Sequence, residues 1–215
     1  MKYKYILFDL DGTITEPKEG ITKSMQYALR KYNINIEDLD SLVKFIGPPL
    51  MDSFQEHYGF SEEKAKEAVE FYREYYREKG MFENLLYPGI SEMLKNLKNI
   101  GCTIILATSK PTVFAEQILG HFNIRAYFDY VVGSNLDGTR GKKGDIIKYI
   151  IDMCSIKNLN EVIMVGDRKY DIIGAQENNI DSIGVTFGYG SIEELKEAKP
   201  TYISDSAENI CNLIF

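Results

Sequence analysis

Two carboxylates separated by a single residue end the first apolar run of the chain. The run begins at Tyr5, reaches Asp9 and Asp11, and is followed by Gly12 and Thr13. Two acids this close repel each other unless a cation lies beside them, and carboxylate oxygens are ligands that hard cations prefer. An ordinary Asp-Gly turn is the alternative, but an apolar run that ends in two acids favours a metal site.

Hydroxyl groups follow the next long apolar run, residues 103–107. Thr108 and Ser109 come directly after it, and Pro111, two residues later, suits the first turn of a helix. Hydroxyls and exposed amide N–H groups at a helix N-terminus form an anion site, which a phosphate group fits. Simple capping of the helix by either hydroxyl is the alternative.

Two adjacent lysines precede a helical pattern that extends to Cys154. Lys142 and Lys143 lie close to the expected helix start, where the helix dipole does not favour a cation. A lysine in this place is either a solvated surface residue or a residue held there for an anion. The spacing alone does not separate Lys142 from Lys143 as the candidate for an anion site.

A second pair of carboxylates follows the apolar run 162–165. Asp167 comes directly after Gly166, and Asp171 lies one helical turn further along the chain. A carboxylate that follows a buried strand and a glycine is a usual way to present a ligand to a hard metal ion. Asp171 has the alternative of capping the helix that comes next.

Apolar runs alternate with helical patterns over most of the chain. The runs expected to form strands are 5–10, 103–107, 130–132, 162–165, 182–185 and, more weakly, 201–203, and the helical patterns cover 90–99, 112–122, 143–154, 171–178 and 192–198. This alternation predicts an α/β fold, a Rossmann-like, doubly wound parallel sheet with helices on both faces. Ligands bind beyond the carboxyl ends of such strands, so the polar segments should meet at one edge.

Residues 16–83 break this alternation, because they contain only helical patterns. We expect them to form an all-helical unit inserted after the first strand, while residues 1–15 and 84–215 form the α/β core. The segments 16–20 and 80–89, which contain glycine and proline, are candidate hinges at the two ends of the insertion.

The composition argues against several classes of protein. The chain has 215 residues and a net charge of −7 without any block of basic residues, so neither nucleic acid nor an anionic membrane is an expected partner. No run approaches the ~18 apolar residues of a membrane span. The three cysteines, Cys102, Cys154 and Cys211, lack paired spacing and indicate reduced thiols in a cytoplasmic protein. The oligomeric state is not legible from the sequence.

The four polar segments together resemble the motifs of the haloacid dehalogenase superfamily over essentially the whole chain. The stretch Asp9–Thr13 resembles the first motif, Thr108 the second, Lys143 the third, and Gly166–Asp167 with Asp171 the fourth. The helical insertion is similar to the small mobile cap, of type C1, found in the phosphoglycolate phosphatase-like branch.

Two segments are most similar to a 5′-nucleotidase-like subgroup of that branch. They are Gly166–Asp171 and a segment that ends in Gly47, Pro48 and Pro49. Arg168 stands where the wider branch has a small hydroxylic residue, which adds a cation near the expected site. The rigid Gly-Pro-Pro interruption is our candidate for a cap loop that contacts the substrate, with a plain helix–helix turn as the alternative.

This resemblance implies a Mg²⁺-dependent phosphatase that works through an aspartyl-phosphate intermediate. Asp9 would be the nucleophile, and Asp11 would act first as general acid and then as general base. Mg²⁺ would be held by Asp9, the backbone carbonyl of Asp11, Asp167 and Asp171. The phosphoryl oxygens would be bound by Thr108, the amide of Ser109 and Lys143.

Three functions share these features. The leading one is hydrolysis of a small phosphorylated metabolite, with a 5′-nucleotide or 2-phosphoglycolate as the candidate substrates. A phosphomutase that acts on sugar phosphates has the same motifs and cap but returns the phosphoryl group to the substrate. A non-catalytic sensor of a phosphate ligand is the third, and such a sensor has no need for both Asp9 and Asp11.

Overall fold

The structure is a computed structural model and describes residues 2–215. The chain divides into two compact units: the core unit joins the N-terminal segment up to Glu16 with Leu86–Phe215, and the inserted unit is Pro17–Leu85. The insertion expected from the sequence, residues 16–83, differs from these limits by one residue at its start and by two at its end.

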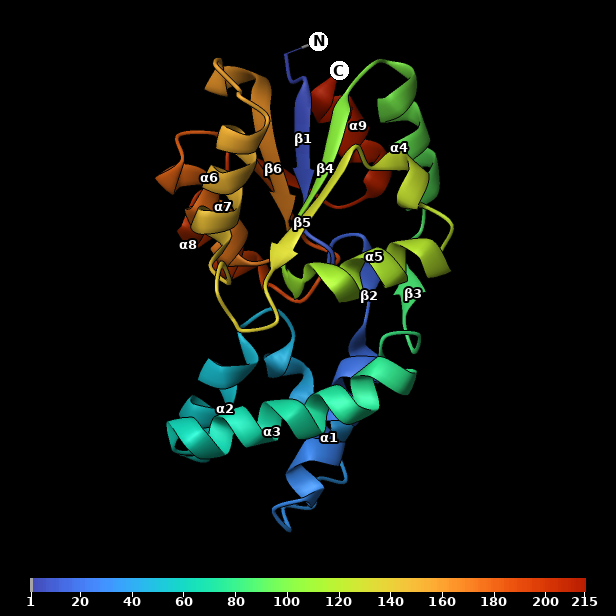
Figure 1. Cartoon of the computed structure of the whole chain (residues 1–215). Helices are drawn as coiled ribbons and strands as arrows, with labels where there is room; N and C mark the ends of the chain where they lie inside the picture. Colours follow the sequence, from blue (N-terminus) through green and yellow to red (C-terminus); the bar gives the residue numbers. More distant parts are fainter. Residues whose placement is uncertain (1) are drawn as a thin grey trace. The chain divides into compact units, whose positions relative to one another are not determined.

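A six-stranded sheet forms the centre of the core unit (Figure 1). Its strands lie in the order β5-β4-β1-β6-β7-β8, and neighbouring strands are parallel. Their bounds are β1 (Tyr5–Phe8), β4 (Thr103–Pro111), β5 (Tyr130–Ser134), β6 (Val162–Gly166), β7 (Asp181–Val185) and β8 (Tyr202–Ser204). The chain starts in the middle of the sheet, moves outward through β4 and β5, and returns beside β1 to form β6. The predicted α/β fold with a doubly wound parallel sheet is therefore confirmed.

Helices cover both faces of this sheet, with α6 and α7 on one face and α4 and α9 on the other (Figure 1). The helices of the core unit are α4 (Ile90–Asn99), α5 (Thr112–His121), α6 (Lys143–Met153), α7 (Lys169–Glu177), α8 (Ile192–Ala198) and α9 (Ala207–Ile214), with short 3₁₀ turns at Arg125–Tyr127 and Leu159–Glu161. Because both faces are covered, the consecutive β1 residues Ile6, Leu7 and Phe8 are all buried.

Strand β4 is longer than the apolar run that predicted it. It extends to Pro111 because, after an irregularity beyond Ala107, Pro111 pairs with Ser134 of β5. Thr108 and Ser109 therefore lie in a strand end and not at a helix N-terminus, which corrects the expectation from the sequence. Pro111 precedes α5 as its N-cap residue instead of lying in the first turn, and no side chain caps this helix.

The inserted unit is built from helices, as its sequence pattern predicted. They are α1 (Lys18–Arg30), the 3₁₀ helix η1 (Leu39–Phe45), α2 (Leu50–Tyr58), α3 (Glu62–Tyr75) and a π-helical turn, η2 (Tyr76–Gly80). The helix α3 thus passes directly into a turn with a different hydrogen-bond pattern after Tyr75. A Cβ atom on Gly20 would lie 1.8 Å from the carbonyl oxygen of Gly80, so α1 and η2 approach at a distance that only glycine permits.

Two short linker strands carry the chain out of the core unit and back into it. They are β2 (Thr15–Glu16) and β3 (Leu85–Leu86), which pair with each other as a separate two-stranded sheet. The linkers thus have regular backbone structure of their own at the two points where the insertion begins and ends.

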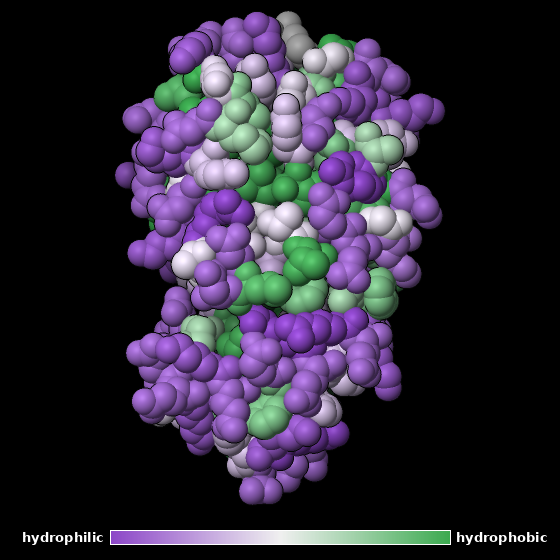
Figure 2. Space-filling model, in the orientation of Figure 1, coloured by the Kyte–Doolittle hydropathy of each residue, from purple (hydrophilic) through white to green (hydrophobic). Residues whose placement is uncertain are grey.

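The surface is mostly hydrophilic on the face drawn in Figure 2, where apolar residues form small patches among polar ones. Within residues 2–215, no helix combines the length and the apolar character needed to cross a membrane.

The packing of the sheet predicts that two isoleucines differ strongly in how much they stabilise the fold. Ile105 of β4 is fully buried in the cluster that joins the sheet to α6, whereas Ile203 of β8 is 38% exposed. We expect Ile105→Ala to lower the free energy of unfolding by about 2–5 kcal/mol through lost burial and a cavity. Ile203→Ala, measured in the same urea titration, should cost less than about 1 kcal/mol. Equal losses would show that the sheet is not packed as described.

Candidate active site

The two carboxylates of the first motif leave β1 in a tight turn. The amide of Asp9 still donates to the carbonyl of Val165 on β6, at 2.9 Å, so Asp9 stays aligned with the sheet. The chain then folds back, because the amides of Ile14 and Thr15 both donate to the carbonyl of Leu10 at 2.9 Å. This turn holds Asp9 in a buried position at the carboxyl end of the central strand.

Asp167 and Asp171 reach the same place from β6 and α7. Asp167 directly follows β6 and is fully buried, and Asp171 lies in the first turn of α7. One carboxylate oxygen each of Asp9, Asp167 and Asp171 lies within 4.8 Å of the other two. Asp171 also accepts a hydrogen bond from the amide of Arg168 at 3.1 Å, so the capping role considered from the sequence coexists with a place in the cluster.

Crowding three carboxylates in a buried site disfavours their charged forms. Burial, together with the charges of the neighbouring carboxylates, raises the pKa of Asp167 well above its usual value. Burial likewise raises the pKa of Asp171 to about 6, although Lys143 opposes the change. One oxygen each of Asp9 and Asp171 lacks a hydrogen-bond partner. Several buried oxygens of this kind form a donor set that fits a divalent cation such as Mg²⁺.

Lys143, the first residue of α6, brings a cation to this cluster. Its Nζ donates to the carbonyl of Ala107 at 2.7 Å and lies 2.8 Å from Asp9 Oδ1 and 2.9 Å from Asp171 Oδ1. The last two contacts are ion pairs without hydrogen-bond geometry. Burial alone would lower the pKa of Lys143, but the charges of Asp171 and Asp9 outweigh it and raise the pKa. Lys142 is exposed, so the structure brings Lys143, and not Lys142, into the cluster.

Asp11 forms a second ion pair, with a residue to which the sequence had assigned no role. Lys110 Nζ lies 2.8 Å from Asp11 Oδ2, and both side chains are largely buried. Burial raises the pKa of Asp11, and Lys110 cancels part of this rise. Lys110 follows Thr108 and Ser109 on β4, so its place at a strand end was the signal that could have identified it.

Thr108 and Ser109 lie at the end of β4. Thr108 is buried, and its Oγ1 accepts a hydrogen bond from the amide of Lys110 at 3.2 Å. The carbonyl of Ser109 accepts a hydrogen bond from Ser134 Oγ at 2.8 Å, which ties this strand end to β5. Both residues therefore occupy the same edge of the sheet as Asp9, on the neighbouring strand.

Two other sequence candidates lie outside this cluster. Arg168 forms an ion pair with Glu194 of α8, with its Nε 2.9 Å from Glu194 Oε1. Gly47, Pro48 and Pro49 connect η1 to α2 in the inserted unit, where Pro49 is the N-cap residue of α2.

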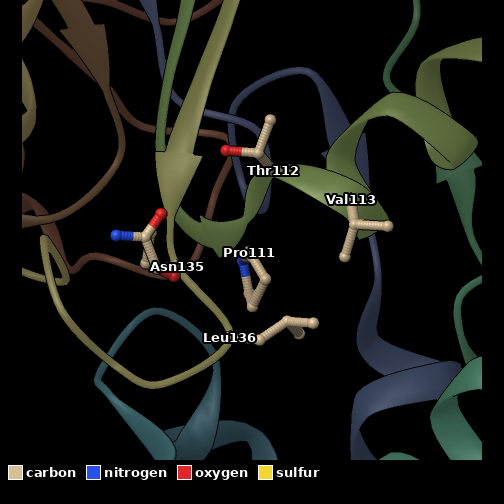
Figure 3. A pocket seen from close by; sticks show the side chains of 6 residues that line it. Pro111, Thr112, Val113, Asn135 and Leu136 are labelled. Atoms are coloured by element: carbon tan, nitrogen blue, oxygen red, sulfur yellow. The ribbon is translucent and has the colours of Figure 1, made fainter.

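A shallow hollow opens beside the end of β4 (Figure 3). Its lining consists of Pro111, Thr112, Val113, Ser134, Asn135 and Leu136. Val113 and Leu136 are 46% and 44% exposed, so apolar side chains of two separate segments face solvent there. Its first lining residue, Pro111, directly follows Lys110 in the sequence.

Comparison with known proteins agrees with this geometry. The family model of haloacid dehalogenase-like hydrolases matches residues 6–185. The chain belongs to this family. It is 46% identical to a 5′-nucleotidase of Pseudomonas aeruginosa over 96% of this chain and 94% of that protein. A phosphoglycolate phosphatase of Vibrio vulnificus is 27% identical over 98% of this chain and 96% of its own.

Solved structures show the same likeness. A predicted phosphatase from Clostridium acetobutylicum has 53% sequence identity and a TM-score of 0.96, with 100% of this chain and 99% of that one covered. The haloacid dehalogenase resemblance inferred from the motifs is confirmed, and the chain is a phosphoric monoester hydrolase of that family.

Close packing in this hydrolase predicts that Gly12 tolerates no side chain. Gly12 and Gly138 have nearly the same backbone angle, φ +83° and +85°, but only at Gly12 would a Cβ meet a neighbour, Asp167 Oδ2 at 2.2 Å. We expect Gly138→Ala to lower the free energy of unfolding by about 1–2 kcal/mol through backbone strain alone. Gly12→Ala should cost roughly 1–3 kcal/mol more, because Asp167 must move. Urea unfolding of both variants measures the difference, and equal losses would contradict the close approach.

Proposed function

We propose that this hydrolase is a Mg²⁺-dependent phosphatase that works through an aspartyl-phosphate intermediate on Asp9. One observation carries the proposal: the Asp9 carboxylate belongs to a buried acidic cluster and also lies 2.8 Å from the Lys143 ammonium. A nucleophile placed beside both a metal site and a fixed cation is what transfer of a highly charged phosphoryl group requires.

The metal would be held by the side chains of Asp9, Asp167 and Asp171 and by the backbone carbonyl of Asp11. This donor set consists of oxygen atoms only, which suits Mg²⁺. When bound, the ion supplies charge neutralisation at the carboxylates and polarises a phosphoryl oxygen.

The chemistry would proceed in two steps on the residues of the first motif. In the first, Asp9 attacks phosphorus, the bond from phosphorus to the ester oxygen breaks, and Asp11 gives its proton to the leaving oxygen. In the second, Asp11 takes a proton from water as the water oxygen bonds to phosphorus and the bond from phosphorus to the Asp9 oxygen breaks, which releases phosphate and restores the Asp9 carboxylate. The raised pKa of Asp11 supports its role as the proton donor of the first step.

Three groups beside Asp9 would hold the phosphoryl oxygens during both steps. They are Thr108 Oγ1, the amide of Ser109 and Lys143 Nζ. Thr108 and Lys143 are buried, and Lys143 is held by the carbonyl of Ala107. Groups fixed in this way need little reorganisation when negative charge develops on the phosphoryl group.

The substrate would be a small phosphate ester, for which a 5′-nucleotide is our first candidate and 2-phosphoglycolate the second. The relatives named above support both candidates. The hollow that contains Val113 and Leu136 would contact the leaving group, as would the loop Gly47–Pro49. A phosphomutase is the alternative function, in which the phosphoryl group of Asp9 returns to the substrate.

A panel of phosphate esters tests the reaction. Nucleoside 5′-monophosphates, 2-phosphoglycolate, sugar phosphates and an aryl phosphate are assayed with Mg²⁺ and with chelator, with product analysis to separate hydrolysis from isomerisation. We expect Asp9→Asn to lower kcat by a factor on the order of 10³ or more, because an amide does not replace the nucleophile. The exposed Asp205 provides a control, since Asp205→Asn should keep wild-type activity. Near wild-type turnover by Asp9→Asn would refute the assignment.

Proton binding by the acidic cluster predicts how Mg²⁺ affinity changes with pH. Without metal, the pKa of Asp171 is about 6 in the folded state, which is higher than in the unfolded state. The stability that Asp171 contributes to the metal-free protein is therefore lost as the pH rises through about 6. Mg²⁺ binds only the deprotonated carboxylate and must therefore displace any proton bound there. Below about pH 6, the affinity of the cluster for Mg²⁺ should fall about tenfold per pH unit for each proton that the ion displaces.

Thermal unfolding measures this dependence. We expect the rise in Tm caused by Mg²⁺ to be larger at about pH 7.5 than at about pH 5, because protons compete for the cluster at the lower pH. Potassium chloride at matched ionic strength is the control for screening. A rise in Tm that is the same at both pH values would mean that Mg²⁺ binds elsewhere.

A further inference from the structure

The loop between β7 and α8 packs directly against the buried carboxylate of Asp167. The amide of Tyr189 donates to Asp167 Oδ2 at 2.7 Å. The glycines on either side of Tyr189 leave no space for a side chain: a Cβ on Gly188 would lie 2.3 Å from Asp167 Cβ, and one on Gly190 would lie 2.0 Å from the Asp167 carbonyl oxygen. The position of this loop is therefore set by Asp167.

The same loop also holds the two linker segments of the core unit. Tyr189 Oη donates to Glu16 Oε1 at 2.5 Å, and Glu16 is the last residue before the insertion. On the returning segment, the ring of Tyr87 lies 4.9 Å from the ring of Phe187, centroid to centroid. The amide of Tyr87 donates to the carbonyl of Ile14 at 3.2 Å, which joins the two segments to each other.

We propose that Tyr189 is a positioning residue that couples the Asp167 carboxylate to the linker at Glu16, so that metal binding at Asp167 orders the linker. The proposal rests on the proposed function to the extent that Asp167 holds the metal. The contacts of Tyr189 with Asp167 and Glu16 use different atoms, the backbone nitrogen toward Asp167 and the phenol oxygen toward Glu16, and the phenol also interacts with Tyr87 on the returning segment. One residue thus transmits a shift at either end to the other.

This coupling has a direct consequence for the insertion. The two linker segments are its covalent connections to the core unit, one at Glu16 and the other at Leu86. When the linkers become more ordered on metal binding, the state of the metal site reaches the insertion through the chain itself. Coupling between two sites is reciprocal. If metal binding orders the linker by a given factor through the contact with Glu16, loss of this contact must weaken metal binding by the same factor.

Hydrogen–deuterium exchange with Mg²⁺ as the probe tests the coupling without any substrate. In the wild-type protein, we expect Mg²⁺ to slow amide exchange in the peptides that cover residues 14–17 and 85–88 by about fivefold or more, the low end of ordinary coupling between sites. Tyr189→Phe keeps the amide bond to Asp167 but loses the phenol. It should retain the protection of residues 167–171, lose that of both linker peptides, and bind Mg²⁺ about fivefold more weakly in calorimetry.

Matched variants separate this effect from a general loss of stability. Tyr130→Phe removes a phenol oxygen from a tyrosine that is 45% exposed on β5 and should behave as wild type. Glu16→Ala should also lower the linker protection, and the double variant should be no worse than Tyr189→Phe alone, because that variant already lacks the contact with Glu16. Glu16→Gln keeps an acceptor oxygen and should restore most of the linker protection.

The outcomes distinguish the coupling from the metal assignment. If Tyr189→Phe shows the same Mg²⁺-dependent linker protection as wild type, the coupling is refuted while the metal site stands. If Mg²⁺ neither binds in calorimetry nor protects residues 167–171 of the wild type, the metal assignment fails. In that case the metal-free linker should still exchange faster in Tyr189→Phe than in Tyr130→Phe, and equal rates would refute the contact itself.

Discussion

The constraint on which this structure depends is the burial of several carboxyl groups at one edge of a parallel sheet. Asp9, Asp167 and Asp171 place oxygens within 4.8 Å of one another where water is largely excluded. In such surroundings, ionisation of a carboxyl group costs free energy unless cations are close. Lys143 supplies one positive charge at 2.8–2.9 Å, which leaves the cluster with a net negative charge that a divalent ion would balance.

The strand order explains how residues distant in sequence satisfy this constraint. Because β1 lies between β4 and β6, the ends of three neighbouring strands present Asp9, Thr108 and Asp167 at one edge. Helix α6, which packs against β4, brings Lys143 to the same edge. Tight turns then close the site, since Gly12 and Gly188 admit no Cβ beside Asp167. The strand order thus brings the residues of the site together, and close backbone packing encloses Asp167.

The acidic cluster lies within one of the two units. The family match covers residues 6–185, and the residues of the acidic cluster all belong to the core unit. Arg168, which directly follows Asp167 of the acidic cluster, forms an ion pair with Glu194 at 2.9 Å and so ties this segment to α8. We propose that the reaction takes place in the core unit, and that the hollow beside β4 and the insertion determine the choice of substrate.

The sequence by itself determined the strand–helix alternation and the helical insertion, and it identified Asp9, Asp11 and Asp167 as candidate site residues. These features are local, because they depend on the residues that directly follow an apolar run. The tertiary structure alone separated Lys143 from Lys142, because only the fold decides which of two neighbouring side chains is buried against carboxylates.

Contacts between distant residues were likewise beyond the sequence. Lys110 meets Asp11 and Tyr189 meets Glu16 across about 100 and 173 positions of chain, and no spacing rule links them. The extension of β4 to Pro111 has the same origin, since it depends on pairing with Ser134 of another strand. Pairing, burial and charge neutralisation arise from long-range contacts, which exist only after the chain has folded.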